Sequence, residues 1–357
     1  MGVPIQPVTL PITGDAFDEV IDVRAPEEFA EDHITGAINL PVLDDAQRAF
    51  VGTMHKQQSP FEARRLGAGL VSAAIGKHLE THLADKPRSY RPLIYCWRGG
   101  QRSHSLATVM SAIGWRVCLL KGGYKAYRTH VRETIESLAP TFKYRVLNGL
   151  TGSGKTRILH ALKTLDAQVL DLEGLANHKG SLFGGHLITP QPSQKRFESR
   201  LFDQLVSFDN TQPVWVEAES PKIGYVNIPK GLWNPLRESE VIEIATTTES
   251  RANHLYLDYQ DWIEQPERIL ATIERLRPFH SKATIESWIA LSDNGSWKAL
   301  ITELLVEHYD TRYGANGSGH YPMPLKQVKL PDQSAQSVLV CARDLLDHKA
   351  GIVTSGS

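Results

Sequence analysis

The segment that most constrains the fold is GLTGSGKT at residues 149–156. It fits the pattern G-x-x-x-x-G-K-[S/T] in full, follows the apolar run YRVLN, and leads into the helical stretch TRILHALKTL. In such loops the glycines free backbone N–H groups to surround phosphates, while Lys155 would reach the outer phosphate and Thr156 would offer its hydroxyl to Mg2+. We therefore predict a strand, a phosphate-binding loop and a helix. The predicted diphosphate-binding residues are Gly149, Leu150, Thr151, Gly152, Ser153, Gly154, Lys155 and Thr156.

Short apolar runs alternate with helical stretches along the rest of the chain. The runs lie at residues 20–23, 93–95, 117–120, 146–150, 169–172, 214–216 and 241–245. Alternation of this kind is typical of α/β architecture with mainly parallel sheets. The chain has 357 residues, and one domain usually holds about 100–200. The sequence therefore predicts two α/β domains.

A connecting helix is predicted over residues 124–142. Apolar residues recur there at spacings of three and four from Tyr124 to Leu138, and Pro140 ends the pattern. We expect a parallel-sheet domain at 1–123 and the phosphate-loop domain at 143–312. Residues 313–357 are expected to form a loop and a helix that pack on the rest.

The net charge of the chain is only −1, which excludes a uniformly basic nucleic-acid coat. Residues 86–157, however, contain 14 Lys or Arg and two acidic residues, a local net charge of +12. Such a window suits the phosphate backbone of a nucleic acid. The alternative is that the charged flank of a helix in this window is simply its solvent-exposed face. The candidate nucleic-acid-binding residues are Lys121, Lys125, Arg128 and Arg132.

Cysteine usage and the N-terminus exclude several classes of protein. Three scattered cysteines form no disulfide framework, and no Cys/His spacing is that of a zinc site. The N-terminal residues lack a basic start and an apolar core, and no run of 18 apolar residues occurs. We expect a soluble, unanchored protein of the cytoplasm.

The segment LIYCWRGGQRS at 93–103 places Cys96 directly after an apolar strand and before a helical stretch. Backbone N–H groups of a glycine-containing loop at a helix N-terminus bind oxyanions and lower the pKa of a thiol. We predict that Cys96 is a nucleophilic thiolate; the alternative is a structural cysteine at a strand end. The predicted oxyanion-loop residues are Trp97, Arg98, Gly99, Gly100, Gln101, Arg102 and Ser103.

Residues 10–130 resemble the rhodanese family. The motifs IDVRAPEEF (21–29), HITGAINLP (33–41), the Cys96 loop and LLKGGYKAY (119–127) follow one another in the order of that family. The resemblance implies a rhodanese-like parallel-sheet domain. Five residues separate Cys96 from Arg102, whereas rhodanese loops usually have four. This Cys-x5-Arg spacing resembles that of Cys-dependent phosphatases. A phosphatase also needs a general acid, and no Asp or Glu lies between Lys86 and Arg132.

Acidic residues follow two of the predicted strands beyond the phosphate loop. Asp171 and Glu173 follow one, and Glu217 and Glu219 follow the other. We predict that Asp171 or Glu217 holds the Thr156-bound Mg2+ through water; helix caps and surface acids are the alternatives. The candidate residues for a second substrate are Asp171, Glu173, His178, Lys179, Ser181, Glu217, Glu219, Lys222 and Arg251. No guanine-specific N-K-x-D motif occurs. The phosphate loop is compatible with a nucleotide or with another diphosphate as its ligand.

The two halves in combination resemble the tRNA 2-selenouridine synthase family. The likeness extends over CWRGGQRS (96–103), KGGYKAYR (121–128), DLEGLANHKGSLFG (171–184) and VEAESPKIG (216–224). It implies that the P-loop domain uses geranyl diphosphate to convert 2-thiouridine at the tRNA wobble position to S-geranyl-2-thiouridine. It also implies that the rhodanese-like domain replaces the geranylthio group with selenium from selenophosphate, carried on Cys96 as a perselenide.

The same resemblance implies the cofactors and partners. We expect Mg2+ and no tightly bound organic cofactor, a tRNA that carries 2-thiouridine, and a transient contact with an enzyme that produces selenophosphate. Trp97 is a candidate for stacking on the extruded uridine, with core packing as the alternative. Two other classes of function stay open at this point. They are a Cys-x5-Arg phosphatase fused to a nucleotide kinase, and a nucleotide-sensing module in which Cys96 is inert.

Overall fold

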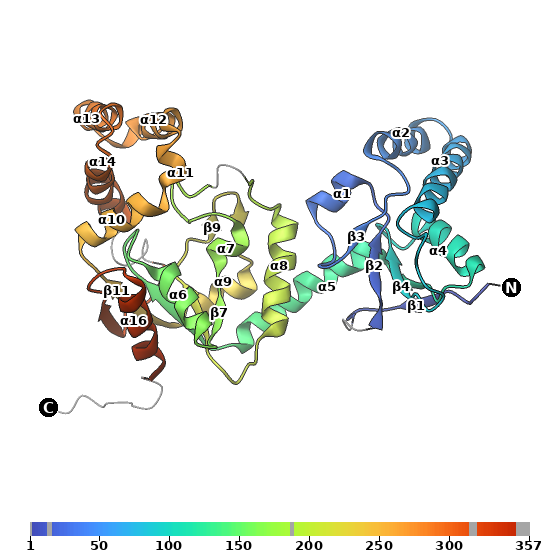
Figure 1. Cartoon of the computed structure of the whole chain (residues 1–357), viewed down its shortest axis with the longest axis horizontal. Helices are drawn as coiled ribbons and strands as arrows, with labels where there is room; N and C mark the ends of the chain where they lie inside the picture. Colours follow the sequence, from blue (N-terminus) through green and yellow to red (C-terminus); the bar gives the residue numbers. More distant parts are fainter. Residues whose placement is uncertain (1, 13–15, 186–188, 314–319, 348–357) are drawn as a thin grey trace. The chain divides into compact units, whose positions relative to one another are not determined.

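The computed structural model describes residues 2–12, 16–185, 189–313 and 320–347. The chain divides into two compact units (Figure 1). The first unit consists of Met1–Thr134 and Ser193–Asp203, and the second of Ile135–Pro192 and Gln204–Ser357.

The first unit is built on a parallel sheet with the strand order β1-β5-β4-β2-β3. Its strands are β1 (Gln6–Val8), β2 (Glu19–Asp22), β3 (Ile38–Asn39), β4 (Pro92–Tyr95) and β5 (Cys118–Leu120). Its helices are α1 (Pro26–Glu31), α2 (Asp45–Gln57), α3 (Pro60–Glu80), α4 (Gln101–Ile113) and most of α5 (Gly123–Leu138). Strands β2 and β4 share one apolar core with α3 and α4, through side chains such as Ile21, Ile94, Val71 and Leu106.

The second unit contains a parallel sheet with the order β12-β11-β6-β8-β7 and a small antiparallel hairpin. The sheet strands are β6 (Tyr144–Asn148), β7 (Gln168–Leu170), β8 (Val214–Glu217), β11 (Glu240–Ala245) and β12 (Lys326–Lys329). The hairpin strands are β9 (Lys222–Ile223) and β10 (Val226–Asn227).

Helices surround this second sheet and form an additional lobe. The helices are α6 (Lys155–Thr164), α7 (Leu172–Ala176), α8 (Gln194–Ser207), α9 (Lys230–Arg237), α10 (Thr248–Asp258), α11 (Gln260–Ile263), α12 (Pro266–Glu274), α13 (Lys282–Asp293), α14 (Trp297–Glu303), α15 (Thr311–Tyr313) and α16 (Ala335–Asp347). Shorter or irregular turns are η2 (Ala139–Thr141), η3 (Arg277–Phe279) and the π-helix η4 (Leu304–Asp310). Helices α12 to α14 form the lobe seen at the upper left of Figure 1.

The periodicity of α16 shows why this helix forms and where it packs. Val338, Cys341, Ala342 and Leu345 are buried at spacings of three and one, which place them on one helical face. They share a core with Ile158 and Leu162 of α6 and with sheet residues such as Leu147, so α6 and α16 cover the same part of the sheet.

The α/β class and the parallel sheets predicted from the sequence are confirmed. All seven predicted apolar runs contain strands, and the amphipathic helix that ends before Pro140 is α5, with Tyr124, Tyr127 and Val131 buried. The strands β1, β3 and β12 and the β9–β10 hairpin were not predicted. Strands β3, β9 and β10 have only two residues each, and β1 (QPV) and β12 (KQVK) contain no apolar run.

The two compact units differ from the predicted domains in two places. Residues 193–203 group with the first unit, where α8 contacts α5 and the segment after α1. The C-terminal segment is more than a loop and a helix, since β12 is a strand of the second sheet. Residues 314–319 and 348–357 of that segment lie outside the described residues. None of the helices in the described ranges is long and apolar enough to span a bilayer.

Candidate functional site

The thiol of Cys96 lies at the junction between β4 and α4. Its Sγ accepts a hydrogen bond from the Gly100 N–H at 3.2 Å and lies 3.2 Å from the Ser103 hydroxyl. Gly100 is the N-cap of α4, so Sγ lies at the positive end of a helix macrodipole. This geometry stabilises a negative charge on sulfur or on a bound oxyanion.

The first residues of α5 hold the backbone of the Cys96 loop. The Tyr124 N–H donates to the Cys96 carbonyl at 2.8 Å, and the Lys125 N–H donates to the Trp97 carbonyl at 2.9 Å. Gly123 has a φ of +57°, and a Cβ atom there would overlap the Cys96 carbonyl oxygen, so no larger residue fits. The position of the loop therefore depends on the position of α5.

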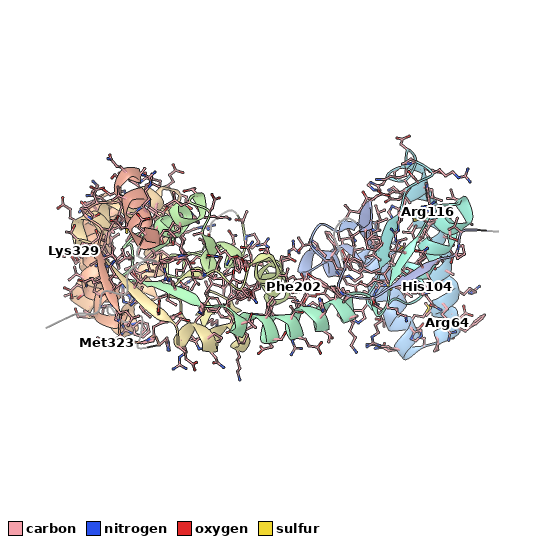
Figure 2. The ribbon with its side chains drawn as sticks, turned by 90° about the horizontal axis from the view of Figure 1, so that it is seen from below. Arg64, His104, Arg116, Phe202, Met323 and Lys329 are labelled. Carbon is pink, nitrogen blue, oxygen red and sulfur yellow. The ribbon has the colours of Figure 1, made fainter. Side chains whose placement is uncertain are left out.

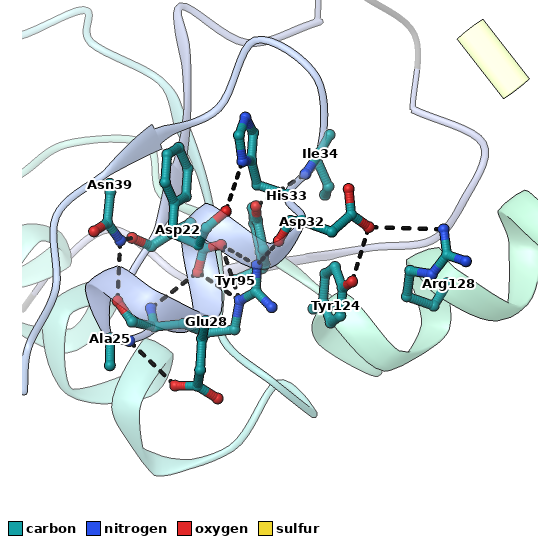
Figure 3. A network of polar contacts seen from close by, with 12 residues as sticks. Asp22, Ala25, Glu28, Asp32, His33, Ile34, Asn39, Tyr95, Tyr124 and Arg128 are labelled. Carbon is teal, nitrogen blue, oxygen red and sulfur yellow. Dashed lines mark hydrogen bonds and ion pairs between the residues drawn. The ribbon is translucent and has the colours of Figure 1, made fainter. Parts of the chain in front are cut away.

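A buried polar network fixes α5 in turn (Figure 3). Asp32, which is fully buried, accepts a hydrogen bond from the Tyr124 hydroxyl at 2.8 Å. The Arg24 guanidinium pairs with Asp22, with 2.6 Å between Nη2 and Oδ2, and lies 3.7 Å from the centre of the Tyr124 ring. Burial, together with the charge of Asp32, raises the pKa of Tyr124 far above its ordinary value, so its hydroxyl remains a donor.

The phosphate-type loop of the second unit connects β6 to α6. Gly149 has a φ of +151°, and a Cβ atom there would lie 2.6 Å from the Ile244 carbonyl oxygen, so only glycine permits this close approach. The Lys155 ammonium donates to the Gly149 carbonyl at 2.9 Å. Lys155 thus lies across the loop, where it would meet a bound phosphate.

Carboxylates gather beside Thr156. Its Oγ1 lies 3.1 Å from Oε2 of Glu173 and 3.2 Å from Oε2 of Glu217, and Glu217 also accepts the Glu173 N–H at 3.0 Å. Burial, followed by repulsion from Glu173, raises the pKa of Glu217 and Glu219 well above the ordinary value. A bound cation would relieve this repulsion.

The arrangement fits a magnesium ion shared with a phosphate ligand. Thr156 and Glu217 or Glu173 would hold the ion, since Mg2+ commonly takes one or two carboxylates and completes its shell with water and phosphate oxygens. Among the described residues, no group of three or more His, Cys, Asp or Glu side chains forms a ready metal site.

The phosphate loop borders a cavity of about 430 Å3. A second, apolar pocket of about 70 Å3 adjoins it, and the two share Thr151, Ser181, Leu255, Tyr259 and Tyr309. The remaining wall of the second pocket comes from the helical lobe, from the neighbouring α11 and η4, and from the segment between α7 and α8; it includes Phe183, Trp262, Ile269, Trp297, Leu300 and Leu304. A ligand with a phosphate end and an apolar end would match this pair of spaces.

Comparison with known proteins gives the same two-part division. Residues 10–130 match the family described as "Rhodanese-like domain", and residues 142–274 match "tRNA 2-selenouridine synthase AAA domain". The tRNA 2-selenouridine synthase of Shewanella denitrificans is 34% identical over 298 residues, which cover 82% of this chain and 78% of that protein. The chain belongs to the tRNA 2-selenouridine synthase family.

Two further members of the family align over a shorter region. The tRNA 2-selenouridine synthase of Nitrosomonas europaea is 39% identical over 244 residues, or 67% of this chain and 63% of that protein. The corresponding protein of a Sulfurovum species is 38% identical over 246 residues, or 67% of this chain and 65% of that protein. The matched region therefore spans slightly less than two thirds of these two relatives.

The structure separates the predicted second-substrate residues of this family member into two groups. Those on the wall of the 430 Å3 cavity are Asp171, Glu173, His178, Lys179, Ser181 and Glu219. Those away from its wall are Glu217, Lys222 and Arg251. Lys179 pairs with Asp258 at 2.7 Å, and Ser181 lies 3.2 Å from the Tyr259 hydroxyl, so both are held on the wall by α10 and the residue that follows it.

The contacts of two of these residues define their places more closely. Asp171 lines the cavity, and its oxygens are already engaged: one caps α7 through the Gly174 N–H at 2.7 Å, and the other bonds His160 at 2.9 Å. Arg251 is 1% exposed, pairs with Asp310 at 2.7 Å, and donates to the Thr151 carbonyl at 2.8 Å, so in this structure it supports the phosphate loop.

Two basic residues of the first unit also differ from expectation. Arg102 pairs with Glu28, with 2.6 Å between Nη1 and Oε2, and Arg128 pairs with Glu198 and lies 3.6 Å from Asp32. Both guanidinium groups therefore already serve internal partners. Lys121, Lys125 and Arg132 are exposed. Trp97 is half-buried against the Tyr124 ring, 5.4 Å between centres, which favours a packing role.

The sequence prediction missed several residues of both sites. Asp32, His160, Tyr259 and Tyr321 belong to no recognised motif, although Tyr321 holds the Glu219 backbone through hydrogen bonds of 2.9 and 3.1 Å. For Asp32 the only available signal was its place directly before the motif HITGAINLP.

Proposed function

We propose that this protein modifies the wobble uridine of tRNA in two steps, as a transferase. In the first step, the P-loop domain transfers a geranyl group from geranyl diphosphate to the sulfur of 2-thiouridine. In the second step, the rhodanese-like domain replaces the geranylthio group with selenium from selenophosphate, which gives 2-selenouridine. The names of the related proteins support the overall reaction, the formation of 2-selenouridine in tRNA. The geranyl step is supported by the cavities of the second unit.

The observation that carries the geranyl step is the apolar pocket beside the phosphate cavity. A nucleotide base would need polar partners, whereas this pocket is walled by aromatic and aliphatic side chains such as Trp262, Trp297 and Leu300. An isoprenoid diphosphate would place its diphosphate in the phosphate-loop cavity and its apolar chain in the second pocket. The Tyr259 hydroxyl is already bonded to Ser181 at the boundary, so it does not make the pocket polar.

The chemistry of the first step requires that negative charge be stabilised on the leaving group. The thiouridine sulfur forms a bond to C1 of the geranyl group, the C1–O bond breaks, diphosphate departs, and the uridine N3 proton passes to solvent or a base. Lys155 and the loop N–H groups would hold the diphosphate as its charge develops. Magnesium held by Thr156 and Glu217 or Glu173 would supply further neutralisation.

The second step is assigned to the Cys96 loop. Alkylation turns the sulfur at C2 into a better leaving group, and selenium takes its place. The overall exchange consumes water and releases geranylthiol and phosphate. The Gly100 N–H and the Ser103 hydroxyl, both 3.2 Å from Sγ, would hold negative charge on Cys96 or on the oxyanions of selenophosphate.

A phosphatase activity is less compatible with the first unit. Glu28, although distant in sequence, contacts the Cys-x5-Arg loop through Arg102. Burial favours its neutral form, but the hydrogen bond and charge of Arg102, together with the Ala25 N–H and the charge of Arg48, hold its pKa below the ordinary value. An ionised Glu28 engaged with Arg102 is unsuited to donate a proton to a leaving group.

Nucleoside analysis of an in vitro reaction tests the proposal. A tRNA anticodon stem-loop with 2-thiouridine is incubated with geranyl diphosphate and Mg2+, and then with selenophosphate. We expect S-geranyl-2-thiouridine followed by 2-selenouridine. Cys96→Ser should stop the reaction at the geranylated nucleoside, because Cys96 and the phosphate loop belong to different units. Absence of the geranylated nucleoside, or loss of both products in Cys96→Ser, would contradict the two-step scheme.

A further inference from the structure

Part of α8 belongs structurally to the first unit, although it follows the phosphate loop in the sequence. Ser199 on this helix donates a hydrogen bond to the buried Asp32 carboxylate at 3.0 Å. The same Asp32 oxygen accepts the Tyr124 hydroxyl of α5 at 2.8 Å (Figure 3). Asp32 thus joins α8 to the first turn of α5.

Arg128 forms a second link between the two helices. Its guanidinium pairs with Glu198 and donates to the Ser199 hydroxyl and to the Lys195 carbonyl, both at 3.2 Å. The Arg128 side chain is 13% exposed, which makes the pairing stronger than a surface ion pair. Removing one partner would leave a largely buried charge without its counterion.

An aromatic contact adds a third link. Phe202 of α8, labelled in Figure 2, meets the Tyr127 ring edge-on at 6.4 Å between centres and the His130 ring at 5.5 Å. Tyr127 and His130 both lie on α5, one turn apart. Residues 198–202 therefore hold α5 over about two turns.

The N-terminal end of α5 is also what holds the Cys96 loop. Tyr124 supplies both connections: its N–H bonds the Cys96 carbonyl at 2.8 Å, and its hydroxyl bonds Asp32 at 2.8 Å. A shift of α5 would accordingly move the Cys96 backbone relative to α4, whose N-terminus supplies the Gly100 N–H to Sγ.

We propose that Ser199 and Glu198 are positioning residues for Cys96. They act through Asp32, Arg128 and α5, and they keep the Cys96 thiol over the N-terminus of α4. The inference rests on the proposed use of Cys96 as a reactive thiol. It assigns a role in the first reaction centre to residues that the family comparison places in the "AAA domain", at 142–274.

Alkylation of Cys96 in the full chain tests this inference. The variants are Ser199→Ala, Glu198→Gln and their combination, with Ser207→Ala, exposed on the last turn of the same helix, as the matched control. Iodoacetamide modification of the Cys96 peptide is followed by mass spectrometry across a range of pH, so that Cys118 and Cys341 do not interfere. Thermal unfolding is recorded in parallel.

In the double variant we expect Cys96 to be alkylated about two- to five-fold more slowly at neutral pH, the factor that corresponds to weakening one helix-terminus interaction. The pH profile should move to higher pH, and Ser207→Ala should match the unaltered protein. Ser103→Ala is the positive control, because it removes a direct contact to Sγ. A shifted pH profile in this variant would show that the assay detects a change in the surroundings of the thiol.

An unchanged rate and pH profile in the double variant, beside a shifted Ser103→Ala, would overturn the inference. If the double variant does not fold, Tyr124→Phe takes its place, because it removes only the hydroxyl that reaches Asp32 and keeps the aromatic contacts. The assay contains neither tRNA nor selenium, so its outcome is independent of whether the proposed two-step reaction is correct.

Discussion

Arg102 and Glu28 form an ion pair beside the Cys96 loop, with 2.6 Å between Nη1 and Oε2. The pair connects the first turn of α4 to α1, and the same Glu28 oxygen accepts the Ala25 N–H at 3.1 Å. Glu28 therefore stabilises both the start of α1 and the loop that carries the thiol.

This pair predicts a specific acid sensitivity. Folding holds the pKa of Glu28 below its ordinary value of 4.5, so the carboxylate contributes stability above that value and loses it as the pH falls through the folded pKa. Glu28→Gln should consequently lose less stability than the unaltered protein between about pH 5 and about pH 3. Urea unfolding midpoints measure this, with Glu27→Gln on the exposed side of α1 as the control. Equal acid sensitivity in all three proteins would contradict the prediction.

Lys155→Ala should reduce geranyl transfer strongly. The ammonium is the side-chain cation of the phosphate loop, and loss of one preorganised charge-stabilising group commonly costs a factor of about 10^2 in rate. Single-turnover formation of S-geranyl-2-thiouridine is the measurement. Lys163→Ala, exposed near the end of the same helix, is the matched control. A wild-type rate in Lys155→Ala would mean that the loop serves another ligand.

Glu217→Gln should affect both stability and metal binding. Three carboxylates lie together near Thr156, and removal of one charge reduces their repulsion. We expect the metal-free variant to unfold about 2–4 °C higher, the shift that roughly 1 kcal/mol produces in a unit of this size. The further rise caused by Mg2+ with pyrophosphate should be smaller than in the unaltered protein. Glu238→Gln, exposed after α9, should change neither quantity; a full Mg2+ response in Glu217→Gln would exclude Glu217 from ion binding.

The exposed cations of α5 should contribute to tRNA affinity differently from Arg128. Replacing Lys125 and Arg132 by Ala should flatten the dependence of log K on log salt by somewhat less than two units, similarly for different tRNAs. Arg128→Ala should instead lower the thermal stability of the first unit, because it leaves Glu198 without its counterion and leaves Asp32 with only Arg196, at 3.9 Å. Filter binding and thermal unfolding separate the two effects. Arg64→Ala, exposed on α3 (Figure 2), is the control, and an unchanged salt slope in the double variant would place the tRNA elsewhere.

The features that sequence could predict were those formed by neighbouring residues. The phosphate loop and the Cys96 loop each lie between one strand and one helix, so a local pattern was enough to recognise them. Asp32 could not be recognised in this way, because its partners Tyr124 and Ser199 are 92 and 167 residues distant in the chain. The apolar pocket was equally hidden: its wall residues form ordinary amphipathic patterns that would suit any helix–helix contact.

The internal partners of Arg128 were hidden for a related reason. The sequence places it on a charged flank with Lys125 and Arg132, but only the fold brings Glu198 to it. Periodicity distinguishes the faces of a helix and does not reveal which face a distant helix will cover.

The inclusion of residues 193–203 in the first unit has a consequence for protein synthesis. A ribosome that has released only the first 134 residues has not yet made Glu198 and Ser199, so Arg128 and Asp32 still lack partners that the finished unit provides. Domains generally fold in order as they emerge, but this N-terminal unit is completed only once residue 203 is free. The phosphate loop at 149–156 has by then emerged as well, whereas Glu217 beside Thr156 and Ile244 against Gly149 have not. The Cys96 loop therefore obtains its last supporting contacts while the second unit is still being synthesised.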